Sequence, residues 1–162
     1  MDRYAASVYR FLVSLQAASD DAEDALQECF VSAWRSAATY GGSDSARAWL
    51  FSIARNALRR QHRRKVGEPD TMEPLEQLGA RAGWGASSDF SVRFEVEDEL
   101  QWAMGQLPGE EREAVTLRDL EGLTGEETAE ALGLSLAATK SRLHRGRLHL
   151  MGVLRAAEVD DA

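Results

Sequence analysis

One long interruption in a helical pattern is the feature that most limits how this chain can fold. Apolar residues recur at helical spacing through most of the sequence, whereas residues 66–91 contain glycine, proline, serine and acidic residues without a sustained period. So long a connection without structure of its own is uncommon within one compact domain. The sequence therefore predicts an all-α protein with two small helical domains, residues 1–65 and 92–162, joined by a flexible linker at residues 66–91.

Three helices are predicted in the first half. They cover residues 3–17, a segment capped by Asp20 or Asp21, and a segment that begins near Ser43 or Asp44. The apolar stripe of the second helix comprises Leu26, Cys29, Phe30, Ala33, Trp34 and Ala37. The stripe of the third comprises Ala46, Trp49, Leu50, Ile53, Ala54, Ala57 and Leu58. The opposite face of the third helix is basic, with Arg55, Arg59, His62 and Arg63.

In the second half, helical pattern resumes around residues 91–106, and Pro108 is expected to open the next helix, which ends near residues 121–122. Thr124 and Glu127 fit a Ser/Thr-x-x-Glu capping box, so a short helix is predicted from Thr124. Gly133 suits the left-handed end of that helix, and Ser135 can cap a last helix that runs to about Ala156.

Composition excludes several classes of protein. No apolar run approaches the ~20 residues of a membrane span, and the first residues lack the features of a signal peptide. The single cysteine, Cys29, cannot form an internal disulfide and is expected in the core. The three histidines are scattered, so neither a metal site nor another cofactor is predicted. We therefore expect a cytoplasmic protein that is not inserted in a membrane.

Charge is distributed unevenly along the chain, although the formal net charge is −8. Residues 1–65 carry ten Lys/Arg against seven Asp/Glu, and residues 135–155 carry five against none. The intervening residues 66–134 are strongly acidic. Local potential matters more than the total for binding a polyanion, so two basic regions within an acidic molecule are compatible with a nucleic-acid partner.

The segment from Glu127 to Leu143 has the pattern of a helix-turn-helix, with a short helix, a turn at Gly133 and a longer basic helix. Ala129 is small where the helices would cross, and three leucines are placed to pack the pair: Leu132, Leu136 and Leu143. The second helix is predicted to expose Thr139, Lys140, Ser141, His144, Arg145 and Arg147. Such a helix fits the major groove of DNA, although a basic helix alone is also typical of a solvated surface.

The first basic region has a different character. A polar loop at Thr39 and Tyr40, followed by two glycines, precedes the basic third helix. This arrangement suits single-stranded nucleic acid, since a groove can follow phosphates while an unstacked base enters a pocket. The alternative is that the arginines only keep the surface soluble. Trp49 lies on the apolar stripe and is expected in the core, whereas for Tyr40 both interpretations remain open.

The sequence resembles the extracytoplasmic-function (ECF) sigma factors of bacterial RNA polymerase. The matching stretches are DAEDALQECFVSAWR from Asp21 to Arg35, AWLFSIARN from Ala48 to Asn56, Leu107–Pro108 with Glu111, GLTGEETAEALG from Gly122 to Gly133, and TKSRLHR from Thr139 to Arg145. The resemblance covers about residues 4–65 and 92–152. Family members usually carry more chain, including another helix, before the segment that matches Tyr4–Leu15.

The resemblance implies a promoter-recognition subunit without catalysis of its own. The first domain would correspond to the family's region 2. Region 2 would dock on the β′ clamp helices of core RNA polymerase through Asp24, Gln27 and Glu28. It would recognise and open the −10 element through Thr39, Tyr40, Ser43, Asp44, Arg47, Asn56, Arg59 and Arg63. The second domain would correspond to the family's region 4. Region 4 would contact the β flap and read the −35 duplex through Arg118, Lys140, Ser141, His144, Arg145 and Arg147. An anti-sigma factor is a further partner that the family implies.

Three other interpretations remain at this point. A DNA-binding regulator could use only the helix-turn-helix, with the first domain as a partner module. A protein that mimics a sigma factor to sequester a regulator would be expected to lack the basic faces. An enzyme is disfavoured, because the sequence has no nucleophile–base set, phosphate-binding glycine loop or metal-ligand spacing.

Overall fold

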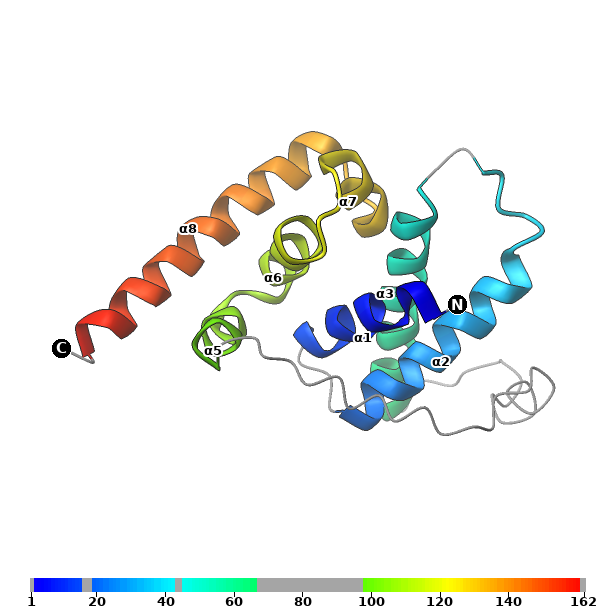
Figure 1. Cartoon of the computed structure of the whole chain (residues 1–162), viewed down its shortest axis with the longest axis horizontal. Coiled ribbons are helices and arrows are strands. Elements are labelled where there is room, and N and C mark those ends of the chain that lie inside the picture. Colours follow the sequence, from blue (N-terminus) through cyan, green and yellow to red (C-terminus); the bar gives the residue numbers. More distant parts are fainter. Residues whose placement is uncertain (1, 16–18, 43–44, 67–97, 161–162) are drawn as a thin grey trace.

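The computed structural model describes residues 2–15, 19–42, 45–66 and 98–160. The regular structure within these ranges is entirely helical, as predicted (Figure 1). Almost all of the predicted linker lies outside the described residues, as do Ser43 and Asp44. None of the described helices is long and apolar enough to cross a membrane.

The first domain contains three helices: α1 (Asp2–Ser14), α2 (Ser19–Ser36) and α3 (Ala46–Val66). The first turn of α2 contains Asp20 and Asp21, where negative charge favours the helix N-terminus. At the start of α3 the Ser45 hydroxyl accepts a hydrogen bond from the Ala48 amide at 3.4 Å. The three helices pack on one another and bury one apolar face of each.

The second domain contains α5 (Asp98–Gln106), α6 (Gly109–Val115), a π-helical turn η1 (Thr116–Leu120), α7 (Gly125–Leu132) and α8 (Leu136–Asp160). Both halves of the predicted capping box form at the start of α7: Glu127 N donates to Thr124 Oγ1 at 3.1 Å, and Thr124 N donates to Glu127 Oε2 at 2.7 Å. Gly133 has a φ of 66°, the left-handed conformation predicted for the end of α7. Pro108 precedes α6 as its N-cap and does not occupy the first turn.

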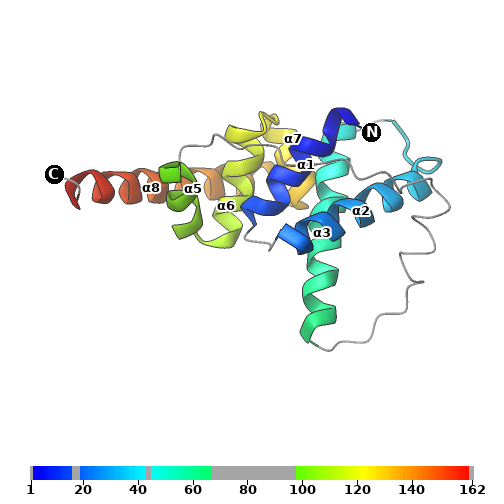
Figure 2. The ribbon, with the colours of Figure 1, turned by 60° about the horizontal axis from the view of Figure 1, so that its bottom comes forward.

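Arg112 joins α5 to α6. Its guanidinium donates to the carbonyl oxygens of Met104, Gly105 and Leu107 at 2.6–2.9 Å, so it satisfies backbone acceptors at the end of α5. Burial lowers the pKa of Arg112 from its ordinary value. This contact holds the end of α5 to α6, and α5 also packs against α8 (Figure 2).

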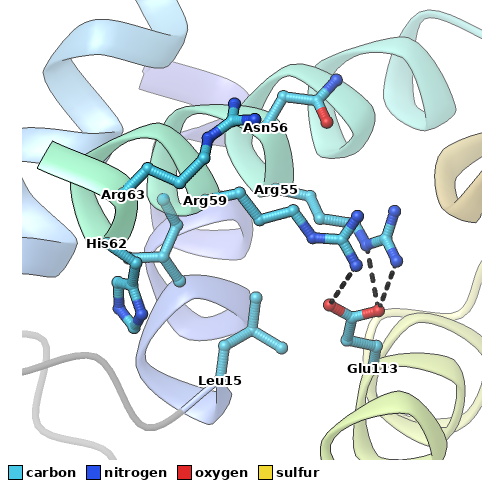
Figure 3. A pocket seen from close by; sticks show the side chains of 8 residues that line it. Leu15, Arg55, Asn56, Arg59, His62, Arg63 and Glu113 are labelled. Carbon is cyan, nitrogen blue, oxygen red and sulfur yellow. Dashed lines mark hydrogen bonds and ion pairs between the residues drawn. The ribbon is translucent and has the colours of Figure 1, made fainter. Parts of the chain in front are cut away.

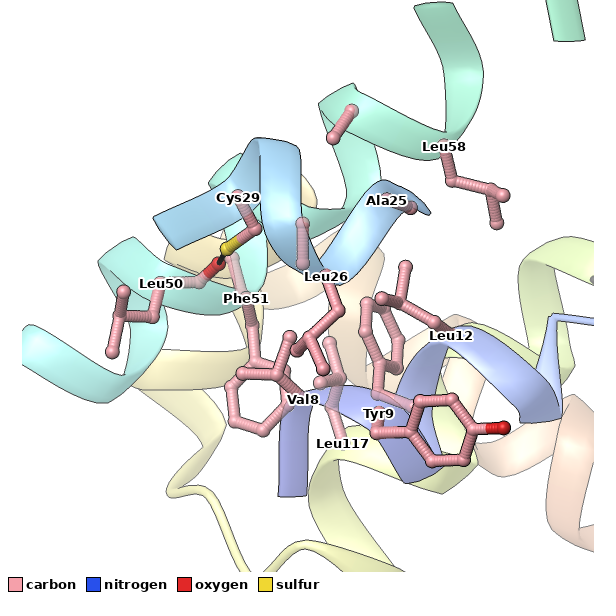
Figure 4. Close-up of a cluster of buried hydrophobic side chains, with 14 of the residues drawn as sticks. Val8, Tyr9, Leu12, Ala25, Leu26, Cys29, Leu50, Phe51, Leu58 and Leu117 are labelled. Carbon is pink, nitrogen blue, oxygen red and sulfur yellow. Dashed lines mark hydrogen bonds between the residues drawn. The ribbon is translucent and has the colours of Figure 1, made fainter. Parts of the chain in front are cut away.

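One continuous hydrophobic core runs through both domains, which the sequence interpretation did not anticipate. Leu117 of η1 is fully buried and belongs to the same cluster as Val8 and Leu12 of α1 and Phe51 of α3 (Figure 4). Phe11 and Phe51 meet edge to face, with ring centroids 5.3 Å apart. The two helical domains are therefore packed against each other along α1, α3, η1 and α7.

The burial of three aromatic or basic side chains differs from what the helical pattern predicts. Trp34 was assigned to the apolar stripe of α2 but is 72% exposed. Trp49 is only partly buried and stacks on Tyr40, with ring centroids 4.7 Å apart. Arg55 was assigned to the outer face of α3 but is buried, because the second domain covers that part of the helix.

Candidate nucleic-acid interface

The first half of α8 presents a polar, mainly basic surface. Lys140, Ser141, His144 and Arg145 are exposed and recur at a spacing that places them on one side of the helix, and Arg147 is exposed beside them. We refer to these five residues as the α8 surface. Thr139 was expected there but is fully buried, and its hydroxyl donates to the Ser135 carbonyl one turn earlier at 3.0 Å.

Carboxylates of α6 and η1 orient two arginines of the α8 surface. Arg147 makes a two-pronged pair with Asp119, at 2.8 and 2.6 Å, and this contact raises the pKa of the Arg147 guanidinium. Arg145 Nε lies 3.5 Å from Glu111 Oε1. The side chains of Arg145 and Arg147 remain 58% and 51% exposed, so both guanidinium groups stay accessible to a phosphate or a base edge. Arg118 lies partly buried in η1.

A second polar surface lies along α3 and is formed by Asn56, Arg59 and Arg63, all of which are exposed. We call it the α3 surface. These residues line a pocket of about 490 Å³ at the seam between the domains, together with His62 (Figure 3). Glu113 of α6 closes one side of the pocket, and Arg59 Nη2 lies 3.9 Å from Glu113 Oε1. The α3 surface is thus basic but partly neutralised by the second domain.

The loop before α3 is also engaged by the second domain. Arg47 donates to the Glu121 carbonyl oxygen. The Ser45 hydroxyl donates to the Glu127 carboxylate, and this bond, followed by the one from the Thr124 amide, lowers the pKa of Glu127. Thr39 is exposed and its hydroxyl donates to the Ser36 carbonyl at 2.8 Å. Of the residues expected to capture an unpaired base, Arg47 therefore lies close to the start of α7.

The residues expected to contact polymerase do not share one environment. Asp24 and Gln27 are exposed on α2. Glu28 is only 3% exposed, and its Oε1 accepts from Arg60 Nε at 2.6 Å. Its carboxylate holds α2 to α3 and is not available at the surface, so the direct contact expected of Glu28 is corrected to a structural role.

Exposed apolar side chains form a feature that sequence reasoning missed. Trp34 projects from the same side of α2 as Asp24 and Gln27, since positions 24, 27, 31 and 34 follow one helical face. In the second domain, Leu148 and Met151 are exposed one turn apart on α8, and Trp102 is exposed on the neighbouring α5. The available signal for Trp34 was that it shares a helix face with the polar residues Asp24 and Gln27.

Cys29 is fully buried and its thiol lies 3.5 Å from the Leu50 carbonyl oxygen. Burial, followed by the nearby Glu28 charge, raises the pKa of the thiol to about 12. Within the part of the chain that the structure describes, no group of three or more His, Cys, Asp or Glu side chains could hold a metal ion.

Comparison with known proteins identifies the family. Residues 1–67 match Sigma-70 region 2, and residues 97–150 match Sigma-70 region 4. The ECF RNA polymerase sigma factor EcfG of Rhodopseudomonas palustris is 30% identical over 96% of this chain and 83% of its own length. The chain belongs to the ECF sigma factors. SigM of Bacillus subtilis, of the same family, is 32% identical over 98% of this chain and 94% of its own.

A solved structure supports the fold. The sigma factor RpoE of Bartonella quintana, crystallised with the anti-sigma factor NepR, superposes with a TM-score of 0.68 over 93% of this chain and 91% of that chain, at 23% identity. As an ECF sigma factor, the protein binds core RNA polymerase and promoter DNA and directs transcription initiation. Sigma factors are non-catalytic subunits of the polymerase.

Proposed function

We propose that the α8 surface reads the −35 element as duplex DNA. The observation that carries this assignment is the row of exposed Lys140, Ser141, His144 and Arg145 directly after the helix-turn-helix turn at Gly133. Arginine and lysine reach guanine edges or phosphates from a helix placed in the major groove. No acidic residue lies between Ser135 and Ala157 to oppose the phosphates. Arg147 and Arg118 would add contacts from the flank.

The α3 surface and the preceding loop would recognise the opened −10 element. Asn56, Arg59 and Arg63 supply polar and basic groups along one helix. Tyr40 stacks on Trp49, which gives a planar wall beside the loop where an unstacked base could lie. Thr39 and Arg47 complete this set, with Ser43 and Asp44 of the same loop.

Core polymerase would be held by α2 and by the second domain. Asp24, Gln27 and the exposed Trp34 form one side of α2 suited to the β′ clamp helices, with the tryptophan as an apolar anchor. Leu148, Met151 and the neighbouring Trp102 offer an apolar face for the β flap. The protein would act in the cytoplasm with the polymerase, and an anti-sigma factor would compete for these faces.

A pair of arginine substitutions on α8 tests the −35 assignment. Arg145→Ala should reduce promoter-directed transcription with core polymerase and relax discrimination at one position by about 1–3 kcal/mol. Arg155→Ala removes an exposed arginine from the same helix, beyond the α8 surface, and should leave discrimination unchanged. Equal effects of the two substitutions across salt concentrations would remove Arg145 from the set of base-reading residues.

A further inference from the structure

Glu111 is a buried carboxylate that contacts two side chains of α8 at once. It lies in the first turn of α6, and only 9% of its side chain is exposed. Its Oε2 lies 2.5 Å from His149 Nδ1, and its Oε1 lies 3.5 Å from Arg145 Nε. The two oxygens of one carboxylate are therefore divided between an arginine of the α8 surface and a histidine outside that surface.

The geometry of α8 brings Arg145 and His149 to the same carboxylate. Residues four positions apart are neighbours on one face of a helix, and α8 packs directly on α6 (Figure 1). Gly146 permits a close approach, since a Cβ atom there would be 3.2 Å from the Glu111 carbonyl oxygen and 3.3 Å from Glu111 Cβ. The Glu111 side chain therefore starts from a fixed point beside α8.

His149 holds the Glu111 carboxylate from one side. An ionised carboxylate only accepts hydrogen bonds, so Nδ1 of His149 carries the proton and donates to Oε2. The neutral ring with its proton on Nδ1 and the charged ring can both make this bond. With Oε2 held by the histidine, Oε1 is left beside Arg145. A side chain fixed by burial and by such a supporting bond can in turn orient its neighbour.

The way in which Arg145 is held leaves its terminal nitrogens for DNA. The ion pair with Glu111 reaches Nε, the inner nitrogen of the guanidinium. A guanine edge is bound by two donors of one guanidinium, and a contact at Nε does not use the two terminal amino groups. Arg147 differs, because Asp119 takes both its Nε and its Nη2. Arg145 is therefore the better placed of the two arginines to read a base.

We infer that Glu111 and His149 are positioning residues for promoter recognition: His149 fixes the Glu111 carboxylate, and the carboxylate holds Arg145 in the orientation that reads a base of the −35 element. The inference rests on the proposed function of the α8 surface. A free arginine loses side-chain freedom when it binds a base, whereas an arginine that is already held loses less. The carboxylate thus reduces the general attraction for phosphates and increases the discrimination between bases.

Removal of the Glu111 charge separates these two effects. Glu111→Gln makes the second domain more positive, which strengthens the attraction for phosphates whatever the sequence. The same change releases Arg145 and should weaken discrimination at its base by about three- to tenfold, the size of one lost hydrogen bond or charge-assisted contact. Opposite changes in affinity and discrimination indicate a positioning role. A substitution that merely loosened the fold would lower both.

Transcription by core polymerase with the full chain measures both quantities. The base that Arg145 reads is the upstream position at which Arg145→Ala relaxes discrimination. The ratio of transcription from the preferred template to that from a template changed at this base alone is then compared between variants. We expect this ratio to fall by about three- to tenfold in Glu111→Gln and in His149→Ala. His149→Asn keeps a side-chain N–H near the position of Nδ1 and should restore the ratio.

Two further comparisons separate positioning from general effects. Glu110→Gln makes the same charge change at the adjacent residue, whose Oε2 pairs with Arg142 Nη2 at 2.9 Å, and it should leave the ratio unchanged. The other upstream positions should keep their discrimination in Glu111→Gln and His149→Ala, whereas a loosened α8 would relax them all. The template concentration for half-maximal transcription from the changed template should not rise in Glu111→Gln.

Circular dichroism checks that each variant is folded. The His149 side chain is 57% exposed, so His149→Ala carries the test if Glu111→Gln does not fold. An unchanged ratio in folded Glu111→Gln or in His149→Ala, or equal relaxation at every upstream position, would overturn the inference and leave the role of Arg145 intact. If Arg145→Ala relaxes no upstream position, the proposed function itself fails, and the inference fails with it.

Discussion

Gly146 lies against Val115, because α8 crosses α6 at this point. A Cβ atom at position 146 would be 2.8 Å from Val115 Cγ2 and 3.2 Å from the Glu111 carbonyl oxygen. Real Cβ atoms essentially never show the first of these distances, and the second, to a backbone atom, is tighter than nine in ten real Cβ contacts. The glycine therefore sets how closely the basic helix approaches the rest of the second domain.

Gly146→Ala should destabilise the protein by about 1–3 kcal/mol, as expected for overpacking a tight helix crossing. Urea unfolding followed by circular dichroism measures this change. Gly152→Ala, six residues later on the same helix, has nothing within 4 Å of the added methyl and should stabilise by about 0.5–1 kcal/mol. Opposite signs for the two substitutions are the expected outcome; equal effects would contradict the close approach.

Glu28 and Asp24 are predicted to have separate roles, although they lie one turn apart on α2. Glu28→Gln removes the charge that pairs with Arg60 in a buried setting and should lower the free energy of unfolding by about 1–3 kcal/mol. Its affinity for core polymerase should stay unchanged at temperatures where it is folded. Asp24→Asn changes an exposed side chain, so it should leave stability unchanged and weaken polymerase binding.

Binding and unfolding measurements on the same two proteins decide this assignment. Native-like stability of Glu28→Gln together with lost binding would return Glu28 to the contact surface. Trp34→Ala offers a third comparison, because its indole is exposed and its loss should weaken binding without a large change in stability.

Cys29 should resist thiol reagents in the folded protein. The thiolate is the reactive form, and a pKa of about 12 leaves the buried group protonated at pH 8. Modification by a disulfide reagent at pH 8 should therefore proceed only at the rate of unfolding or local opening. A cysteine introduced at exposed Ala38 should react at the rate of a free thiol. Rapid modification of Cys29 in the folded chain would contradict its burial.

The lowered pKa of Glu127 leads us to predict that the stability of the protein depends on pH in a specific way. Its pKa is lowered in the folded state from the ordinary 4.5, chiefly by the Ser45 hydroxyl and then by the Thr124 amide. A lowered folded-state pKa contributes stability that is present above pH 4.5 and is lost as the pH falls through the folded-state pKa. The stability difference between the unaltered protein and Glu127→Gln should therefore be largest near neutral pH and shrink below pH 4.5. A difference that grows on acidification would have the wrong sign.

Local signals in the sequence predicted the parts of the fold that depend on neighbouring residues in the chain. The Thr124–Glu127 capping box and the left-handed Gly133 are satisfied within one helix and its turn, so their pattern is sufficient. The end of helical structure near residues 121–122 was also predicted, but its division into α6 and the π-helical turn η1 was not. Two sigma regions were expected from motifs and are confirmed by the family matches.

Features that depend on packing between distant segments escaped prediction. Helical periodicity placed Arg55 outside and Trp34 inside, but the second domain covers Arg55 and no described element covers Trp34. Thr139 carries a polar side chain, yet its hydroxyl is satisfied by the preceding turn and can be buried. Gly146 resembles any helical glycine until the crossing with α6 is known. The individual roles of the α8 and α3 surfaces in promoter recognition remain predictions.

The most direct measurement is transcription by core polymerase and this chain on a library of random promoters, with sequencing of the transcribed templates. Two enriched motifs at a fixed separation are predicted for the unaltered chain. Arg145→Ala should relax only the upstream motif, and Asn56→Ala should relax only the downstream one. A single enriched motif, or loss of information from both motifs in either variant, would contradict the account of two surfaces reading one promoter.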